Sequence, residues 1–324
     1  MNRNRSVIPL FFAVDDAYAP FLAVALRSIV THISDNYTYR VHVLVQELSG
    51  KHRESLLSMQ TENLSIEFVD VREKLATVGQ KFHLRDYYSL ATYYRFFVPD
   101  MFPEYDRGLY LDSDIIVNED IAHLFFTPLD NNLIAGAVEE VMTHVDVFGT
   151  YTEVVLGIPR NEYVNAGVLL MNLAALRRVQ IEKRLLSMMR DYTFKVTQDQ
   201  DYMNVLCRGH VAYFSTKWNR TAFTERVGEP LPSLAHFKIN WKPWHYTGIA
   251  FEYAFWQYAK ETPFYDALLA MRDGYTDAEK ERDCVMYRDL AALAASDTAA
   301  ARRDGYILPV TYSVAAEKCK TCKG

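Results

Sequence analysis

The chain has 324 residues, of which 50% are hydrophobic and 23% charged, a composition typical of a folded globular protein and not of a disordered one. The formal net charge of −6 does not favour a nucleic-acid-binding protein, since such domains normally carry a basic patch. Four cysteines are sparse for this length and indicate a reducing compartment. No run of about 18 apolar residues exists, so the sequence predicts no transmembrane helix and a cytoplasmic location.

The two ends of the chain carry patterns that need a plain interpretation. MNRNRSVIPLFFAV imitates a signal peptide, but its apolar run is short, reaches Asp15 and Asp16 at once and has no small-residue cleavage site. We therefore expect a first core strand there. Cys319 and Cys322 form a single CxxC, and because a structural zinc site needs four ligands, we interpret them as two thiols on an exposed tail.

Strands and helices are predicted to alternate along the first third of the chain. The predicted strands are 7–14, 39–46, 64–71 and 107–111, and the predicted helices are 17–32, 49–62 and 89–98, the last stopping before Pro99. Such alternation is typical of a mostly parallel sheet with helices on both faces. Ligands bind beyond the carboxyl ends of the strands in these sheets, so we expect four carboxylates that follow strands to gather at one edge: Asp15, Asp16, Asp112 and Asp114.

The remainder of the chain is predicted to change from strands to helices. Strands are expected at 134–138, 167–172 and 211–214, and helices at 174–192 and 199–207. The stretch 139–163 has an irregular pattern, typical of a lid or binding loop. From 249 the pattern is helical to about 301, so we expect two domains, 1–248 and 249–324. Residues 276–324 hold eight Lys/Arg and eight Asp/Glu, and this zero net charge gives no polybasic membrane anchor.

LYLDSDIIV, residues 109–117, places two carboxylates inside an apolar run. Buried charges are costly unless they are paired or metal-bound. Asp112 and Asp114 can converge on one hard divalent ion such as Mn²⁺ or Mg²⁺, which would keep positions open for phosphate oxygens. The alternative is two capping aspartates at a strand-to-turn junction, and the pair taken alone favours that alternative.

HFKINWKPWHY, residues 236–246, follows a short predicted strand and carries a second set of polar candidates. The imidazole of His236 suits Mn²⁺ better than Mg²⁺, and Lys242 offers a point charge for a phosphate. An aromatic-rich surface loop with a satisfied histidine is the alternative. Two further motifs have a purely structural alternative. Arg95 in ATYYRFF could form a structural salt bridge, and the acids of QDQD could cap a helix.

The order of six motifs is more specific than any one of them: (F)AVDDAY, ATYYR, LYLDSDI, NAGVLLMN, QDQD and H(x)5KPW. In this order the chain resembles glycosyltransferase family 8 over about three quarters of its length, residues 7–246. That family comprises retaining sugar transferases, including bacterial lipopolysaccharide galactosyl- and glucosyltransferases and glycogenin. The resemblance implies an α/β GT-A fold, a Rossmann-like mixed sheet flanked by helices, here with a mainly helical C-terminal extension.

The resemblance also implies an activity and a partner set. The expected reaction is Mn²⁺-dependent, retaining transfer of a hexose, galactose or glucose, from a UDP-sugar to a glycan or lipopolysaccharide acceptor, with Mg²⁺ as the alternative ion. The family's basic, aromatic C-terminal tail is not evident here. Peripheral contact with the inner membrane surface through the C-terminal region stays open. The sequence does not decide the donor hexose, the acceptor or the oligomeric state.

Particular residues receive roles from the resemblance. The implied metal ligands are Asp112, Asp114 and His236; the implied donor-binding residues are Ala13, Asp15, Tyr18, Arg95, Asp112, Ser113, Asn165, Asp199, Gln200 and Lys242; and the implied catalytic residues are Gln200, Asp199, Asp112 and Arg95. Ala17 and Ile239 depart from the family pattern, which often has Asn and Gly there. Because the amide of Gln200 is a poor nucleophile, we expect same-face attack and not a covalent intermediate.

Two other functions remain as alternatives. Haloacid-dehalogenase-like phosphatases also place DxD after an apolar strand, with Mg²⁺ as the ion. Their motif lies on the first strand, however, whereas here it follows about four predicted elements. A non-catalytic nucleotide-sugar-binding protein on the same fold is the second alternative, because a fold does not determine a function.

Overall fold

The computed structural model describes residues 5–78, 90–222 and 229–305, and the chain divides into two compact units. The first unit comprises residues 1–73, 108–127 and 215–280, and the second comprises 74–107, 128–214 and 281–324. The predicted CxxC at Cys319 and Cys322 lies outside the described residues. The predicted domain boundary after residue 248 stays a prediction.

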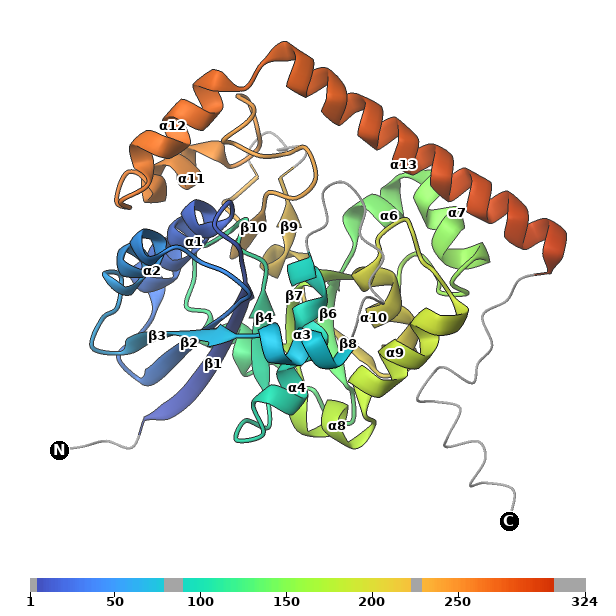
Figure 1. The fold of residues 1–324 in the computed structure, drawn as a ribbon, viewed down its shortest axis with the longest axis horizontal. Coiled ribbons are helices and arrows are strands. Elements are labelled where there is room, and N and C mark those ends of the chain that lie inside the picture. Colours follow the sequence, from blue (N-terminus) through green and yellow to red (C-terminus); the bar gives the residue numbers. More distant parts are fainter. Residues whose placement is uncertain (1–4, 79–89, 223–228, 306–324) are drawn as a thin grey trace. The chain divides into compact units, whose positions relative to one another are not determined.

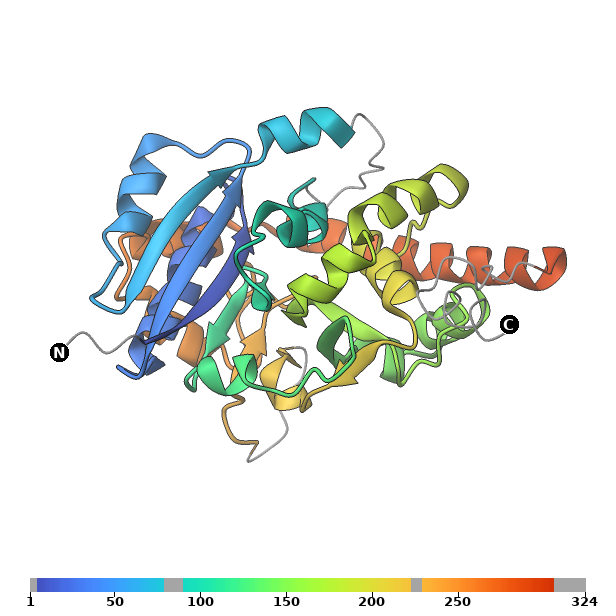
Figure 2. The ribbon, with the colours of Figure 1, turned by 90° about the horizontal axis from the view of Figure 1, so that it is seen from below.

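Four parallel strands form the main sheet of the first unit, in the order β3-β2-β1-β4. Their bounds are β1 (Ser6–Ala13), β2 (Tyr37–Val45), β3 (Leu64–Asp70) and β4 (Gly108–Leu111), all within two residues of the prediction. Figure 2 shows β1, β2 and β3 side by side. β1 and β4 read as nearly continuous apolar runs because parallel strands are covered on both faces. The N-terminal segment is thus a core strand, as expected.

Helices and a small second sheet complete the first unit. α1 (Ala19–His32) lies beside α2 (Gly50–Leu57), β5 (Ile115–Val117) and α11 (Glu252–Ala259) (Figure 1). The second sheet has the order β5-β10-β9, with β10 (Leu234–His236) and β9 (Arg220–Thr221) contributed by the late return of the chain. The other elements are α5 (Ala122–Phe125), η2 (Thr216–Trp218) and α12 (Tyr265–Gly274).

Among its described residues, the second unit contains three strands in the order β7-β6-β8. β6 (Ile134–Val138) runs antiparallel to β7 (Val164–Met171) and parallel to β8 (Val211–Tyr213). Both strand directions therefore occur, which confirms the expected mixed sheet. β7 begins three residues before its predicted start, so Asn165 lies inside the strand and not before it. The strand is buried along its whole length.

The stretch 139–163 is not an irregular loop, which corrects the prediction. It carries α6 (Glu140–His144) and α7 (Asp146–Val154). The side chains of Val141, Met142, Phe148 and Tyr151 are buried, and this burial stabilises two helices of only five and nine residues, which would be marginal in isolation.

Three other helices were predicted with wrong bounds, and the first of them, 49–62, already ends at Leu57 as α2. The predicted helix 174–192 is two helices, α8 (Leu173–Arg178) and α9 (Ile181–Asp191), because Gln180 adopts a left-handed conformation with φ 53°. Near Pro99, a 3-10 helix, η1 (Leu90–Phe96), is followed by α4 (Val98–Met101), whose first turn holds the proline where its missing N–H is no loss. α10 (Asp199–Cys207) has its predicted bounds and lies beside α9 (Figure 1).

The C-terminal region is helical, as predicted, but broken. After α11 and α12 it continues as α13 (Asp277–Asp304), and α3 (Arg72–Val78) is the remaining helix among the described residues. In the described parts of the chain, no helix combines the length and the apolar character needed to cross a membrane.

Candidate metal and sugar-nucleotide site

Backbone pairing in the first unit brings two distant sequence motifs together. β10 runs antiparallel to β5, with His236 opposite Ile115. The amide of Phe237 donates to the carbonyl of Asp114 at 2.8 Å. Asp114 precedes β5 directly, so this ladder places its side chain next to the imidazole of His236, 122 residues later along the chain.

Asp112, Asp114 and His236 converge on one point, as expected. Each offers one ligand atom, and the three atoms lie within 4.8 Å of one another. Nε2 of His236 is 3.2 Å from Oδ1 of Asp114 and 3.8 Å from Oδ2 of Asp112. His236 is 1% exposed and Asp114 8% exposed. Two carboxylates and an imidazole at this spacing fit a Mn²⁺-type ion, and their role as ligands stays a prediction.

Asn219 orients the imidazole, and the sequence pattern did not single it out. Its Oδ1 lies 2.9 Å from Nδ1 of His236, inside a buried environment. An Nδ1–H donated to Asn219 leaves Nε2 with its lone pair on the side of Asp112 and Asp114. Metal-binding histidines are commonly held by such a partner on the other ring nitrogen. No motif predicts this residue, because it lies 17 positions from His236.

Lys242 lies against the same carboxylate. Its Nζ is 2.9 Å from Oδ2 of Asp114. Burial would raise the pKa of Asp114, but the positive charge of Lys242 holds that pKa well below its usual range. Burial alone would lower the pKa of Lys242, and the Asp114 charge raises it instead. The result is a charged lysine beside the three converging side chains.

Trp244 anchors the loop that carries Lys242. Its ring is 1% exposed and stacks on Phe21 of α1 with centroids 3.9 Å apart. Nζ of Lys242 lies 5.1 Å from the Trp244 ring centroid and 5.6 Å from that of Tyr18. KPW is therefore not only a surface loop: its tryptophan belongs to the core, and its lysine is held among two aromatic faces and a carboxylate.

The segment after β1 lies at the same edge as Asp112, because β1 and β4 are neighbouring parallel strands. Oδ1 of Asp15 accepts from the amide of Tyr18 at 3.1 Å, so Asp15 caps the turn that begins α1. Asp16 is exposed and accepts from the amide of Ser49 at 2.8 Å, with Nδ1 of His52 at 2.9 Å. These hydrogen bonds fix the turn, and neither Ala13 nor Ser113 takes part in them.

A second group of predicted residues lies in the second unit. Nε of Arg95 is 3.2 Å from Oδ2 of Asp199, and both side chains are buried. The same guanidinium donates to the carbonyls of Thr92 and Ala166. Arg95 thus has the structural ion pair that the sequence left as an alternative, and through it Asp199 is held at the start of α10.

Gln200 is held against β7 by its amide oxygen. Oε1 accepts from the amide of Ala166 at 3.0 Å and from Nδ2 of Asn165 at 3.1 Å. Nδ2 of Asn165 also donates to Oε2 of Glu139 at 2.6 Å. Glu139 is 3% exposed, and its buried carboxylate was missed because its motif, AGAVEEV, has no recognisable spacing. Three predicted residues and one new carboxylate therefore form one hydrogen-bonded group with Arg95.

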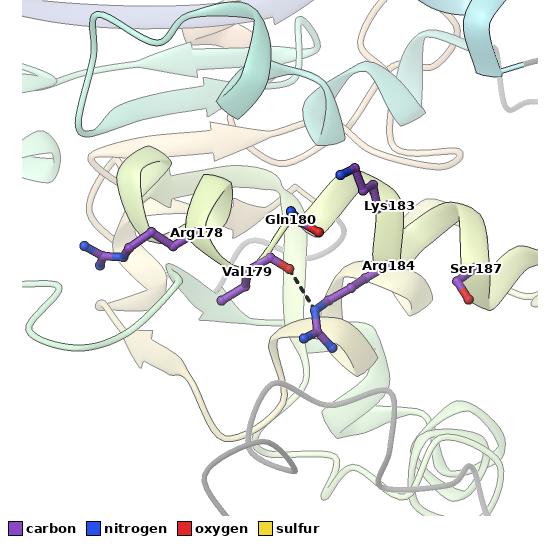
Figure 3. Close-up of a pocket in the computed structure, with 6 residues that line it drawn as sticks. All are labelled: Arg178, Val179, Gln180, Lys183, Arg184 and Ser187. Carbon is purple, nitrogen blue, oxygen red and sulfur yellow. Dashed lines mark hydrogen bonds between the residues drawn. The ribbon is translucent and has the colours of Figure 1, made fainter. Parts of the chain in front are cut away.

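Another depression in the second unit takes no part in this group. It lies at the start of α9 and is lined by Arg178, Val179, Gln180, Lys183, Arg184 and Ser187 (Figure 3). Nε of Arg184 donates to the carbonyl of Val179 at 2.8 Å, whereas Arg178 and Lys183 point in different directions and are exposed. None of the predicted site residues lines it.

Comparison with known protein families now decides the family. The model of glycosyl transferase family 8 matches residues 9–248. The chain belongs to glycosyl transferase family 8. This confirms the expected family and its GT-A fold, and it disfavours the phosphatase alternative.

Two curated relatives are similar to this chain over only part of their length. A putative glycosyltransferase of Haemophilus influenzae is 26% identical over 215 residues, which are 65% of this chain and 63% of the relative. Lipopolysaccharide 1,3-galactosyltransferase of Salmonella typhimurium is 30% identical over 176 residues, which are 50% of this chain and 51% of the relative. The chain thus spans between half and two thirds of the length of these relatives.

Solved structures carry the same fold. An active-site mutant of LgtC is 26% identical, with a TM-score of 0.67 and coverage of 79% of this chain and 96% of that one. LgtC is a galactosyltransferase that has also been solved in complex with donor and acceptor sugar analogues, with a TM-score of 0.64 to this chain. The chain therefore shares its fold with a solved galactosyltransferase.

Proposed function

We propose that this protein is a retaining hexosyltransferase that uses a UDP-hexose and a divalent ion, Mn²⁺ before Mg²⁺. The convergence of Asp112, Asp114 and His236, with Lys242 beside them, carries this proposal. Two carboxylates and an imidazole are a Mn²⁺-type ligand set, and a fixed ammonium is the complement of a diphosphate. A metal bound there supplies Lewis-acid stabilisation of the leaving diphosphate.

The residues near Asp112, Asp114 and His236 would hold the nucleotide part of the donor. Lys242 would place its charge where negative charge develops on the leaving phosphate oxygen. The turn of Ala13, Asp15 and Tyr18, with Ser113, would receive uracil and ribose. Ala17, where the family often has a side-chain amide, would leave one ribose contact unmade.

The residues named from the NAGVLLMN and QDQD motifs would hold the hexose. Asp199, kept in place by Arg95, would accept hydrogen bonds from sugar hydroxyls. Gln200 and Asn165 would face the sugar with amide groups. In the reaction the acceptor hydroxyl attacks the anomeric carbon from the face that the diphosphate leaves. The bond from anomeric carbon to phosphate oxygen breaks, the new glycosidic bond forms, and the departing phosphate takes the hydroxyl proton.

The acceptor is proposed to be a glycan or a lipopolysaccharide-type glycolipid. The name of the Salmonella relative, a lipopolysaccharide 1,3-galactosyltransferase, supports this choice. The sparse cysteines support a cytoplasmic location, with the inner membrane surface as the place where a glycolipid acceptor is met. Cell fractionation with and without high salt tests that location: the proposal expects the protein in the cytosol or salt-released from membranes.

UDP release tests the function without knowledge of the acceptor. Purified protein is given UDP-glucose, UDP-galactose and UDP-N-acetylglucosamine, each with Mn²⁺, Mg²⁺ or a chelator. We expect slow, Mn²⁺-dependent release of UDP from one hexose donor. Tight UDP-sugar binding without any turnover, with or without glycan acceptors, would instead support the non-catalytic alternative. Phosphate release from p-nitrophenyl phosphate would support the phosphatase.

A further inference from the structure

Asp201 is a fully buried carboxylate at the start of α10, one residue after Gln200, and it has no role in the mechanism above. It is 0% exposed. Four hydrogen bonds reach it. Oδ1 accepts from the hydroxyls of Tyr163 at 2.7 Å and Thr197 at 2.6 Å, and Oδ2 accepts from the hydroxyl of Tyr151 at 2.9 Å and the amide of Thr197 at 3.1 Å. Each carboxylate oxygen therefore holds two donors.

These donors come from three separate segments of the second unit. Tyr151 belongs to α7, Tyr163 is the residue before β7, and Thr197 lies two residues before α10. The Tyr163 and Thr197 hydroxyl oxygens also lie 2.6 Å apart. Burial raises the pKa of Asp201, and burial with the Asp201 charge raises the pKa of both tyrosines well above the usual value. The cluster is a dry polar junction and not a solvated cap.

The backbone at this junction is strained. Gln198, between Thr197 and Asp199, has φ 48° and ψ −111°, a region that side chains with a Cβ rarely occupy. Its Oε1 is a buried acceptor without a hydrogen-bond partner among the described residues. Such conformations cost on the order of 1–3 kcal/mol and persist only when neighbouring bonds over-determine them. The two bonds from Thr197 to Asp201 provide that constraint.

Gln200 bridges the two segments that Asp201 joins. Its backbone follows the strained turn, and its Oε1 accepts from the amide of Ala166, three residues after Tyr163. Tyr163 leads directly into β7, whose Asn165 and Ala166 both donate to the Gln200 amide oxygen. One turn further along α10, Asn204 bonds to both the amide and the carbonyl of Val164 at 2.8 Å. Asn204 thus anchors the helix body, whereas Asp201 anchors its first turn.

We infer that Asp201 is a positioning residue that sets the orientation of the Gln200 amide, through Thr197 on one side and Tyr163 on the other. This inference rests on the proposed function for the role of Gln200. With both oxygens occupied by donors and no solvent exposure, Asp201 acts through its neighbours and does not touch the donor sugar. Displacements of about 1 Å at a reacting centre are enough to lower turnover by about 100-fold.

The central variant is Asp201→Asn. It keeps the shape of the side chain but replaces one accepting oxygen by an NH₂ group. That NH₂ would lie against hydrogen-bond donors from Tyr151, Tyr163 or Thr197, so two hydrogen bonds are lost. We expect kcat to fall by about 100-fold. The Kd of UDP with Mn²⁺ should change by less than about twofold, because the residues proposed to bind the ion and the diphosphate are not among the donors to Asp201. Tyr163→Phe removes one donor from the cluster and should lower kcat by about tenfold.

Tyr202→Phe is the matched control. Tyr202 is the next residue on α10 and is also buried, but its hydroxyl donates to the carbonyl of Tyr192 at 2.7 Å, outside the Asp201 cluster. This variant loses the bonds of one buried tyrosine hydroxyl, which also accepts from the amide of Phe194 at 3.4 Å, as Tyr163→Phe loses those of another. A similar drop in melting temperature is expected for the two variants. Its kcat should stay at the wild-type value. An equal loss of kcat in Tyr202→Phe would mean that general destabilisation explains the effect and would overturn the inference.

A double-mutant cycle with Gln200→Ala separates positioning from an independent role. If Asp201 acts through Gln200, then Asp201→Asn should lower kcat by less than about twofold in the Gln200→Ala background. A full 100-fold loss in that background would overturn the inference while leaving the proposed function intact. Failure of the wild type to release UDP would overturn the proposed function, and a crystal structure of Asp201→Asn would then decide: the inference requires Gln200 Oε1 to leave the Ala166 amide.

Discussion

At the scale of single residues, Ile239 holds a backbone conformation that β-branched residues rarely adopt. Its φ is 56°, and the residue lies between His236 and Lys242 in the loop of the converging side chains. Left-handed conformations cost L-residues roughly 1–2 kcal/mol, whereas glycine adopts them freely. The family pattern often has glycine there, so the departure noticed in the sequence corresponds to strain in this loop.

Ile239→Gly should therefore be more stable than Ile239→Ala. The side chain is 37% exposed, so both variants lose its buried part, and in the glycine variant the relief of strain exceeds the added chain entropy of glycine by about 0.5–1 kcal/mol. Urea unfolding measures the free energy of unfolding. Ile239→Ala is the control, since it keeps a Cβ and the strain; a glycine variant no more stable than the alanine variant would contradict the strain argument.

Residue chemistry explains why some members of the site were predictable and others were not. Asp112 and Asp114 interrupt an apolar run, and His236 and Lys242 stand in one short motif, so each leaves a local signal. Asn219 and Glu139 leave none. Their functions follow from which side chain they meet, His236 and Asn165 respectively, and those contacts arise only when strands pair.

At the scale of elements, the ion pair of Arg95 and Asp199 joins η1 to α10. Both side chains are buried, at 2% and 3% exposure. Removing one partner of a buried pair leaves an uncompensated charge, which typically costs about 3–5 kcal/mol. Arg95→Met should lower the free energy of unfolding by that amount in urea melts. The double variant Arg95→Met/Asp199→Asn should be more stable than Arg95→Met alone. Equal stability of the two variants would mean that the unpaired charge on Asp199 does not destabilise the Arg95→Met protein.

α10 also carries a group whose ionisation makes stability depend on pH. Burial raises the pKa of the Cys207 thiol, at the C-terminal end of the helix, to about 12. An unfolded thiol has a pKa near 8.5. The neutral buried thiol therefore contributes fully below about pH 8.5, and its contribution is lost as pH rises from there towards about 12.

Between about pH 8 and about pH 10, wild type should lose about 2 kcal/mol of unfolding free energy through this group. Cys207→Ala removes the ionisable group, and its cavity cost is the same at both pH values. The wild type should thus lose about 2 kcal/mol more than the variant over this interval, measured by urea unfolding under reducing conditions. An identical pH dependence of the two proteins would show that the thiol is not buried as described.

Element prediction succeeded where pattern and packing agree and failed where long-range packing decides. α10 and the first three strands lie within two residues of their predicted bounds. The continuous period of 174–192 gives no warning of the left-handed Gln180, which splits it. In 139–163 the helices α6 and α7 are only five and nine residues long, too short to stand out as a periodic run, and burial of their side chains stabilises them.

At the scale of the whole molecule, the sequence predicted the fold class through motif order more than through periodicity. Alternating strands and helices describe many parallel sheets equally well. The antiparallel pairing of β6 with β7 and the return of the chain to form β10 beside β5 are decided by contacts between distant segments. The six ordered motifs carried that information because they belong to a family whose topology already contains both features.

Binding of metal and nucleotide should raise the stability of the whole protein by mass action. A ligand at about one hundred times its Kd adds about 2.7 kcal/mol to the free energy of unfolding. We expect Mn²⁺ with UDP to raise the melting temperature and a chelator to remove the increase. Lys242→Gln should retain a response to Mn²⁺ alone and lose most of the further response to UDP.

Asp114→Asn should abolish the increase, because the carboxylate that meets both His236 and Lys242 is gone. Asp16→Asn is the matched control. Asp16 belongs to the same unit and follows β1, but its carboxylate bonds to Ser49 and His52 and not to His236 or Lys242. The control should keep the full Mn²⁺- and UDP-dependent increase. Equal responses of the two variants would show that the cluster of Asp112, Asp114 and His236 is not where the ion binds, and the proposed metal dependence would then need another site.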